Sequence, residues 1–588
     1  MKKRSRLIAL LMAAAMTTTM VAGCGSSSKD AGEEASAEAA TLVLRNGVIQ
    51  TMVSEDDTAE AVAINGDEIV YVGDEEGIED YIGDDTEVID LDGAQVTPGF
   101  MDGHQHGGDG TITDMFQVSL WECESNEEYI QAVKEFAESH PDDEVITGGN
   151  FDFNFYAQPD GSNPGPNKED LDKACSDRPV ILWSVDAHSF WVNSKALEMA
   201  GVTKDTPDPA GGVISRNEDG TPRGLLTDNG QEYMWDLLDK VVYTDEQIRE
   251  AAEAFQAEAH SFGVTGMTAM PGGTEDGLLA MDKEGKLSLR LKKGINVQPT
   301  DAPEDAIAAI KEYSESVKDS KWIDGDVAKI FADGVTEGKT AVFLEPYTEA
   351  AGKGPDFKGE YLWTDEELNT MVTALDKEGI QVHIHAIGDG AVNQSVNAFE
   401  KAEEANGTED PRFTMTHVCA VTPEDIQRIS DLKVVSAMQF LWMYADPLYQ
   451  LEKAMIGEER ALAMYPTKDM LEAGCILSGA SDAAVTPYYV LDEIEVAVTR
   501  NSPYPGEDTE DMYRAADQAI TPYQALEAYT KGVAYQNFWE DELGTIEVGK
   551  KADLVVLGDN ILKCDPKAIS DTPILYTIAG GKVVYEAE

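Results

Sequence analysis

The feature that most constrains the fold is a long alternation of short apolar runs with helical stretches, from about residue 96 to residue 540. Strands that alternate with helices form parallel sheets, because each helix returns the chain to the same edge of the sheet. Eight apolar runs fit, and eight parallel strands can close into a barrel. The eight expected strands are Val96–Asp102, Gly263–Met270, Leu287–Val297, Val327–Asp333, Ile380–Ala386, Phe413–His417, Val434–Met438 and Ile476–Ser481. The sequence therefore predicts an α/β fold built on a (β/α)8 barrel.

The stretch from about 107 to 262 is too long for a simple connection between a strand and a helix. We expect it to be an insertion that caps the barrel mouth and shapes a substrate pocket. The 588 residues would suit several domains, but a barrel with insertions can use most of such a length as one unit. The barrel is therefore assigned to 96–540.

Short β runs occupy both ends of this region, at 41–95 and 541–588. Both contain dipeptides that favour tight hairpin turns. These dipeptides are Asn46-Gly47, Asn65-Gly66 and Gly580-Gly581. Because isolated hairpins are marginally stable, we expect the two ends to meet in one small composite β domain.

The N-terminus has the pattern of a targeting segment. Basic residues precede an apolar run, 7–22, which is too short to span a bilayer comfortably. The run ends in Val-Ala-Gly-Cys24, which resembles the lipobox of bacterial lipoproteins, whose cysteine is lipidated; an ordinary signal peptide or an uncleaved anchor is the alternative. We expect a lipoprotein signal peptide at 1–24, a stable diacyl membrane anchor on Cys24 and a flexible acidic tether at 25–40. The protein would then be extracytoplasmic and anchored to the cell membrane.

Composition excludes other classes of function. The formal charge is −67, from 111 acidic and 44 basic residues, so a nucleic-acid partner would be repelled. Apart from Cys24, the five cysteines show no CxxC spacing, which indicates neither a zinc ribbon nor a disulfide framework.

Two histidines end the first expected strand, in the phrase PGFMDGHQH. Residues two apart on a strand point to the same face, so His104 and His106 can converge on one metal ion while Gln105 points away. The carboxyl ends of barrel strands are where such enzymes place their chemistry. Most HxH pairs are ordinary surface residues, but this context favours a metal site.

Three further apolar strands end in metal-type donors, at His385, His417 and Asp482. Nitrogen and oxygen donors from four strands are the mixture that zinc accepts. An aspartate beside a metal-bound water can act as a general base, because the metal lowers the pKa of the water toward ~7. We therefore expect one or two divalent ions, with zinc as the first candidate.

These motifs occur with other phrases that resemble the amidohydrolase superfamily and, within it, the amidohydrolase-3 group. The likeness covers about 41–588. The further phrases are DAHSFWVNSKAL (186–197), GVTGMT (263–268), KIFADG (329–334), HAIGD (385–389), GEERA (457–461) and SGASDAAV (478–485). The resemblance implies a TIM-like metal-dependent hydrolase barrel with a composite β-sandwich domain from both chain ends.

The resemblance also implies roles for individual residues. His104 and His106 match the ligand pair of the more buried metal, and His385 and His417 match the ligands on strands 5 and 6. Asp482 matches an aspartate that contacts the metal and shuttles the proton.

Lys329, which opens KIFADG, matches a lysine that is carboxylated in many relatives and bridges two metals. A carbamate is an anionic, hard oxygen ligand, whereas a free ammonium beside a cation is repelled. A lysine that snorkels or forms a salt bridge is the alternative.

Four more histidines have weaker predictions. His188 lies in a segment that resembles one lining the pocket of relatives, so it would polarise or orient a substrate carbonyl; a structural hydrogen bond is the alternative. His383 is expected in the pocket or the core, and His140 and His260 at the surface or in packing. Six aromatic residues would form either a pocket wall or core. They are Phe151, Phe153, Phe155, Tyr156, Trp191 and Trp442.

The sequence departs from the family pattern at three places. All three leave the candidate metal ligands in place and bear on which substrate is bound. Phe151 replaces the tryptophan of a common GxGWD-like phrase, Thr416 precedes His417 where many relatives carry Glu, and Gln439 is not followed by proline.

The expected activity is hydrolysis of a non-peptide carbon–nitrogen bond in a small-molecule substrate, such as an amide, formamide or cyclic amide. Metal-activated water would attack and Asp482 would shuttle the proton. The alternatives are a lactone or phosphotriester hydrolase with the same metal ligands, and a solute-binding lipoprotein on a degenerate barrel. The sequence leaves the oligomeric state open, with a homodimer as one candidate.

Overall fold

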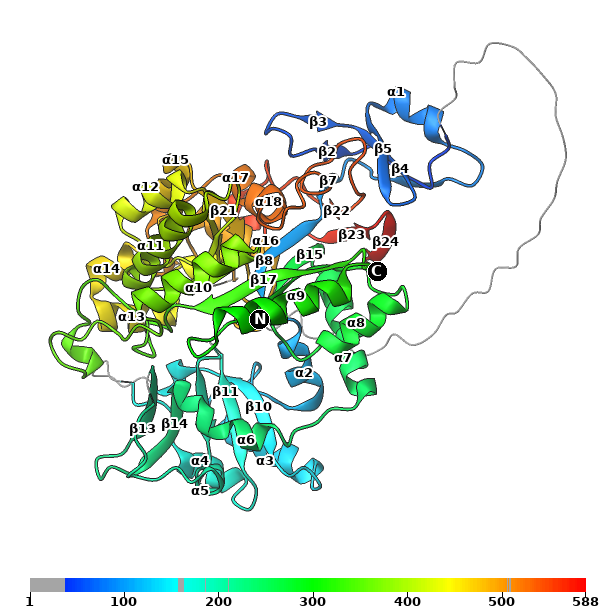
Figure 1. The fold of residues 1–588 in the computed structure, drawn as a ribbon. Helices are drawn as coiled ribbons and strands as arrows, with labels where there is room; N and C mark the ends of the chain where they lie inside the picture. Colours follow the sequence, from blue (N-terminus) through cyan, green and yellow to red (C-terminus); the bar gives the residue numbers. More distant parts are fainter. Residues whose placement is uncertain are drawn as a thin grey trace, which may run out of the picture.

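A computed structural model gives the fold of the chain (Figure 1). The structure describes residues 38–587 except 157–162, 186, 210, 505 and 507–508. The predicted signal peptide, Cys24 and nearly all of the predicted tether lie outside these residues. Within the described ranges, no helix combines the length and the apolar character needed to cross a bilayer.

Eight parallel strands form a nearly closed barrel, in the order β21-β20-β19-β18-β17-β16-β15-β8. In chain order they are β8 (Phe100–Gln105), β15 (Val264–Ala269), β16 (Arg290–Asn296), β17 (Ile323–Phe331), β18 (Gln381–Ala386), β19 (Thr414–His417), β20 (Val435–Met438) and β21 (Ile476–Gly479). Every residue of β8, β15 and β18 is buried, as expected for strands of a parallel barrel that helices cover from outside. Each strand overlaps one of the eight predicted runs, so the barrel prediction is confirmed.

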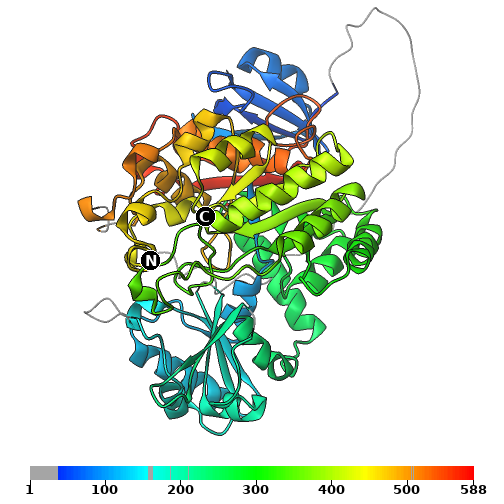
Figure 2. The ribbon, with the colours of Figure 1, turned by 60° about the vertical axis from the view of Figure 1, so that its left-hand side comes forward.

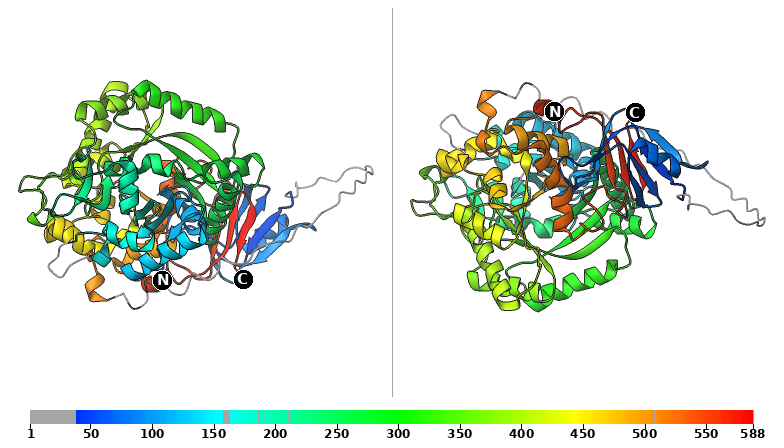
Figure 3. Two further views of the ribbon diagram at one scale, coloured as in Figure 1. Left: turned by 90° about the horizontal axis from the view of Figure 1, so that it is seen from below. Right: turned by 90° about the horizontal axis from the view of Figure 1, so that it is seen from above.

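Helices follow the strands and cover the outside of the barrel (Figures 1 and 3). The main ones are α7 (Asp245–Ser261), α8 (Glu275–Lys283), α9 (Pro303–Val317), α10 (Asp365–Lys377), α11 (Asp389–Asn406), α12 (Pro423–Asp431), α15 (Thr467–Ala473), α16 (Val490–Thr499) and α18 (Val533–Gln536). Thr244 and Thr364 cap α7 and α10 with complete capping boxes, which satisfy backbone N–H groups that would otherwise lack partners.

The predicted strand Val96–Asp102 is wrong as a single element, because the chain changes sheets at Gly99. Residues Gln95–Pro98 form β7 of the terminal β domain, and β8 begins the barrel at Phe100. A Cβ atom on Gly99 would lie 2.2 Å from Thr265 Oγ1, so the crossing is too tight for a side chain. Apolar pattern alone could not locate this boundary, since both halves are buried.

The two chain ends form a β sandwich, as predicted. One sheet has the order β5-β4-β1-β6, and the other has the order β24-β23-β22-β7-β2-β3. Their strands are β1 (Leu42–Arg45), β2 (Val48–Gln50), β3 (Thr58–Ala59), β4 (Ala61–Asn65), β5 (Glu68–Gly73), β6 (Glu87–Asp90), β7, β22 (Leu554–Leu557), β23 (Ile574–Ala579) and β24 (Lys582–Glu586). Leu44 and Val62 of the first sheet share one apolar core with Val96 and Val556 of the second. Figure 3 shows the N-terminal blue strands beside the C-terminal red ones.

Two of the three predicted turns connect paired strands. Asn65-Gly66 joins β4 to β5, and Gly580-Gly581 joins β23 to β24, with φ angles of 55° and 71° at the two glycines. The hairpin expected at Asn46-Gly47 is wrong. There β1 and β2 enter different sheets, because both sheets of the sandwich draw strands from this short stretch.

The insertion forms a six-stranded sheet with the order β13-β14-β12-β11-β10-β9, visible in cyan below the barrel in Figure 2. Its elements include β9 (Val118–Ser119), α3 (Asn126–Ser139), β10 (Ile146–Phe151), α4 (Lys168–Ala174), β11 (Val180–Ser184), β12 (Ser189–Val192), α5 (Ser194–Ala200), β13 (Gly212–Arg216) and β14 (Pro222–Asp228). Phe151, Tyr156 and Trp191 are buried in its core, so these three aromatic residues are core and not pocket wall. Phe155 is exposed. We call this insertion the cap.

Candidate active site

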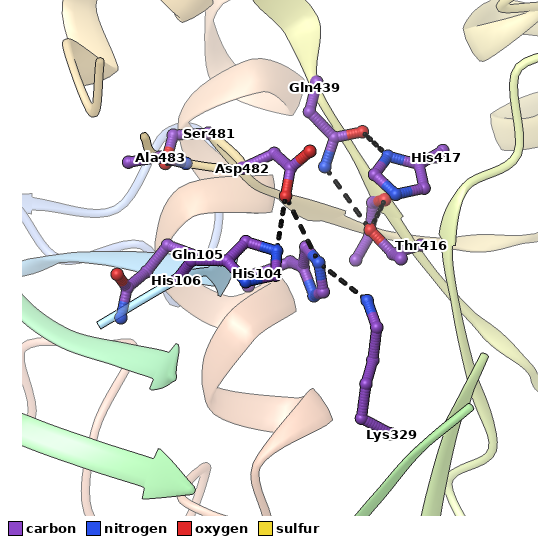
Figure 4. A network of polar contacts seen from close by, with 12 residues as sticks. His104, Gln105, His106, Lys329, Thr416, His417, Gln439, Ser481, Asp482 and Ala483 are labelled. Atoms are coloured by element: carbon purple, nitrogen blue, oxygen red, sulfur yellow. Dashed lines mark hydrogen bonds and ion pairs between the residues drawn. The ribbon is translucent and has the colours of Figure 1, made fainter. Parts of the chain in front are cut away.

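Three metal-type donors from opposite ends of the barrel sequence meet at one point (Figure 4). The Nε2 atoms of His104 and His106 each lie 3.3 Å from Asp482 Oδ1. One ligand atom from each residue falls within 4.8 Å of the others. His104 lies in β8 and His106 directly follows this strand, and both rings face Asp482, which follows β21.

The seam between the first and last barrel strands holds this trio in place. Asp482 N donates to His104 O at 2.8 Å, and Asp102 accepts from Ser481 Oγ at 2.5 Å and from His104 N at 3.0 Å. Asp482 itself has a φ of 59°, which an aspartate tolerates but rarely adopts. Asp102 therefore fixes both strand ends whose side chains form the trio.

Lys329 of β17 points into the same space and is 1% exposed. Its Nζ atom lies 3.0 Å from His104 Nε2. Burial lowers the pKa of the Lys329 amine to about 7, although the nearby Asp482 carboxylate opposes this shift. The lysine forms no salt bridge in the described structure, and it does not snorkel to solvent.

His385 and His417 form a second group on the adjacent strands β18 and β19. Their ring centroids are 4.4 Å apart, and the His417 ring is 5.6 Å from that of His104. His417 Nδ1 donates to Gln439 Oε1 at 2.9 Å, which leaves Nε2 as the nitrogen for a ligand. Both rings are close to the trio but lie outside its tight cluster.

Burial sets the charge state of these rings. It lowers the pKa of His417 to about 4 and holds the pKa values of His104 and His385 well below the ordinary value. Burial would raise the pKa of Asp482, but the imidazole nitrogens of His104 and His106, which face the carboxylate at 3.3 Å, outweigh burial and hold that pKa well below its usual range. Neutral imidazole and ionised carboxylate are the forms that bind metal.

Asp333, at the end of KIFADG, supports the loop that follows His385. Its carboxylate accepts from Ile387 N at 3.0 Å and from Gly388 N and Val342 N at 2.9 Å, and it lies 3.7 Å from His385 Nε2. Burial raises its pKa to about 7 in spite of these hydrogen bonds.

His188 reaches this site from the cap. Its ring centroid is 5.6 Å from that of His385, and its Nδ1 lies 2.5 Å from Asp228 Oδ1. His383 lies in the barrel interior, stacked on His104 at 4.8 Å. His140 is exposed, and His260 is buried between Val264 O and Ser288 Oγ, so both fit the predicted surface and packing roles.

Of the six aromatic residues considered in the sequence, Trp442 contacts a candidate ligand. Its ring stacks on His417 with a centroid distance of 5.3 Å and an angle of 5° between the planes. The indole N–H donates to Thr486 Oγ1 at 3.2 Å. Trp442 is half-buried, so part of it remains open beside the histidines.

Four supporting residues were not predicted from the sequence: Asp102, Asp228, Asp333 and Gln439. Asp102, Asp333 and Gln439 lie within the same sequence motifs as the predicted site residues or next to them, so closeness in sequence to a predicted ligand indicates these three. Asp228 had no such signal, because its partner His188 lies 40 positions away.

The trio fits a cation. Asp482 Oδ1 is buried and accepts no well-formed hydrogen bond, although two imidazole nitrogens face it at 3.3 Å. Two nitrogens and one carboxylate oxygen around a common point form the donor set of catalytic zinc sites, which keep a further position open.

Comparison with known proteins matches the model of an amidohydrolase family to residues 87–585. The chain belongs to the amidohydrolase family. YtcJ of Bacillus subtilis (strain 168) is 30% identical over 551 residues, covering 92% of this chain and 99% of YtcJ. This protein is accordingly a metal-dependent hydrolase of the amidohydrolase superfamily, as its resemblance implied.

This amidohydrolase is also similar to a named enzyme and to a hydrolase of solved structure. N-substituted formamide deformylase of Arthrobacter pascens is 25% identical over 569 residues, covering 93% of this chain and 98% of the relative. An uncharacterized metal-dependent hydrolase from Pyrococcus furiosus has a TM-score of 0.65 at 25% identity, with 89% of this chain and 100% of that chain covered. The deformylase name specifies a substrate class, N-substituted formamides, whereas the names of YtcJ and of the Pyrococcus hydrolase specify none.

Proposed function

We propose that this amidohydrolase cleaves a non-peptide carbon–nitrogen bond in a small molecule: an amide, a formamide or a cyclic amide. The observation that carries the proposal is the convergence of His104, His106 and Asp482 at the barrel mouth, with 3.3 Å between each imidazole nitrogen and one carboxylate oxygen. The relative named as a formamide deformylase supports a formamide as the first substrate class to test.

In this proposal His104, His106 and Asp482 would hold one zinc ion, and His385 and His417 would hold a second. Lys329, carboxylated on Nζ, would supply a further anionic oxygen ligand. The buried position of Lys329, 3.0 Å from His104 Nε2 and on the strand that pairs with the strand of His385, supports this arrangement. When bound, a divalent ion supplies Lewis acidity, which lowers the pKa of water and polarises a carbonyl.

The protein side chains supply the proton transfers. Asp482 would accept the proton of the attacking water as its oxygen bonds to the carbonyl carbon. Asp482 would then give that proton to the nitrogen as the C–N bond breaks, so the products are a carboxylic acid and an amine. His188 would orient the carbonyl oxygen, since its ring lies across from His385.

A site with the same metal ligands can hydrolyse a lactone or a phosphotriester, so the kind of bond that this enzyme cleaves needs its own test. A solute-binding protein would need no such set of buried donors. We also propose that the enzyme acts outside the cytoplasm, held at the membrane through Cys24, as the N-terminal pattern indicates.

The test measures metal per chain by elemental mass spectrometry on soluble protein that lacks residues 1–28. Wild type and Lys329→Ala are compared, with Lys353→Ala as a control because Lys353 is exposed. We expect about two zinc ions in wild type and in the control, and one or fewer in Lys329→Ala. One ion in all three proteins would make Lys329 structural, and no metal after reloading would overturn the hydrolytic mechanism.

Activity is measured on the same preparations with matched amide, formamide, cyclic ureide, lactone and phosphotriester substrates. Turnover that is greatest on the first three and is lost on chelation is the expected result. Preference for the lactone or the phosphotriester would overturn the assignment of a C–N bond.

A further inference from the structure

His188 and Asp228 are brought together by the cap and not by their order in the chain. His188 directly precedes β12, and Asp228 is the last residue of β14, so the two flank the antiparallel register pair Ser189 and Thr227. Asp228 N donates to His188 O at 2.8 Å, and the two side chains meet at 2.5 Å between Nδ1 and Oδ1. The contact therefore has both a backbone and a side-chain component.

The backbone of Asp228 is unfavourable for any residue with a Cβ atom. Its φ of 48° and ψ of −124° lie outside the left-handed helical region that aspartate tolerates, in a part of the map that favours glycine. Asp228 also stands at the N-cap position of a short 3-10 helix, Asn229–Met234, yet its side chain makes no capping hydrogen bond. Neither local geometry nor helix capping accounts for an aspartate here.

The carboxylate also lies against the barrel. A Cβ atom placed on Gly334 would be 2.9 Å from Asp228 Oδ1, and Gly334 O is 3.3 Å from His385 Nε2. Gly334 follows directly on Asp333, at the carboxyl end of β17. The aspartate thus occupies the junction between the cap and the strand ends that carry the site.

We propose that Asp228 is a positioning residue for His188. Its carboxylate accepts the Nδ1–H of the imidazole, which fixes the tautomer and the ring plane and directs Nε2 toward the substrate. This inference rests on the proposed function, in which His188 contacts the substrate oxygen. An orienting carboxylate behind a histidine acts in this way in other hydrolytic sites, because it removes the freedom of the ring to rotate.

The cap supplies two residues of the proposed site. Since His188 and Asp228 both belong to it, whereas the proposed metal ligands belong to the barrel, the complete site forms only when the cap is seated on the strand ends. Substrate selectivity and rate would then depend on this junction and not on the metal ligands alone.

The decisive variant is Asp228→Gly, because glycine accepts the backbone angles without strain. If Asp228 served only the backbone turn, glycine would serve it at least as well, and activity would be intact with an equal or higher thermal midpoint. We expect the thermal midpoint to be equal to or above that of wild type, while kcat on 4-nitroformanilide falls about 10- to 100-fold. KM should change much less than kcat, since ring orientation matters most in the transition state.

A double-mutant cycle separates positioning from an independent role. His188→Ala and the double variant should have the same kcat, because an orienting group has nothing to orient once the ring is gone. Asp236→Asn, an exposed aspartate of the same cap, is the matched control and should equal wild type. Losses that multiply in the double variant would overturn the proposal, as would an Asp228→Gly enzyme with wild-type kcat.

Two further measurements keep this inference distinct from the proposed function. Zinc per chain should be the same in wild type and Asp228→Gly, so a wild-type protein without zinc would count against the metal mechanism and not against Asp228. Nitrogen NMR of histidine-labelled, zinc-loaded protein needs no substrate. The His188 ring, assigned by its loss in His188→Ala, should carry its proton on Nδ1 in wild type and lose this preference in Asp228→Gly. A wild-type ring without a proton on Nδ1 would refute the proposal.

Discussion

A buried ion pair fastens the barrel to the terminal β domain, and its removal should destabilise the whole protein. Arg290 at the start of β16 donates from Nε and Nη2 to the two carboxylate oxygens of Asp553, at 2.7 and 3.0 Å. The Asp553 side chain is 2% exposed, and it also accepts from Gly580 N at 2.8 Å. The guanidinium stacks on Trp322, with 4.6 Å from Cζ to the ring centroid.

Asp553→Ala leaves the Arg290 guanidinium buried without its counter-ion, which costs about 3–5 kcal/mol. An unfolding entropy of about 2.1 cal/mol/K per residue over about 550 residues gives about 1.2 kcal/mol/K, so the midpoint should fall by about 3–4 °C. The double variant Arg290→Met with Asp553→Leu removes both charges and should recover most of this loss, since a buried pair is seldom better than an apolar replacement.

Differential scanning calorimetry on the soluble protein measures these shifts, at one scan rate because unfolding of a chain of this size is often irreversible. Lys401→Ala is the control. It breaks the ion pair of Lys401 with Glu404, whose side chains are 56% and 69% exposed, and should shift the midpoint by less than about 1 °C. An Asp553→Ala midpoint within 1 °C of wild type, or a double variant less stable than the single one, would refute the reasoning.

Three other changes test different parts of the molecule. Cys24→Ala should move the protein from the membrane fraction to the soluble fraction, as followed by immunoblotting; an unchanged location would rule out the lipid anchor. His106→Asn should remove about one zinc ion per chain in elemental analysis, and a full complement of metal would show that the trio is not a metal site. Gly388→Ala places a Cβ atom 2.0 Å from Val342 O. We expect this clash to lower the free energy of unfolding by about 1–3 kcal/mol in denaturant titrations and to lower kcat. An unchanged free energy of unfolding and kcat would mean that the loop accommodates the added methyl group.

The sequence by itself determined the barrel and the ring of donors, for a physical reason. Strands of a parallel barrel are buried on both faces, so they are apolar along their length, and the residues at their carboxyl ends must share one rim. The sequence alone therefore groups His104, His106 and Asp482. The β sandwich from both chain ends followed from the same local signals, since isolated hairpins need a partner.

Tertiary structure alone decided the features that depend on contacts between distant residues. The change of sheet at Gly99 depends on the proximity of Thr265, and the failure of a hairpin at Asn46 depends on which sheet each neighbouring strand joins. Asp228 gave no local signal of a role, because its side chain is used neither for the turn nor for the helix that follows. Strand periodicity encodes which way a side chain faces, but the partner that it meets is set by how the cap packs on the barrel.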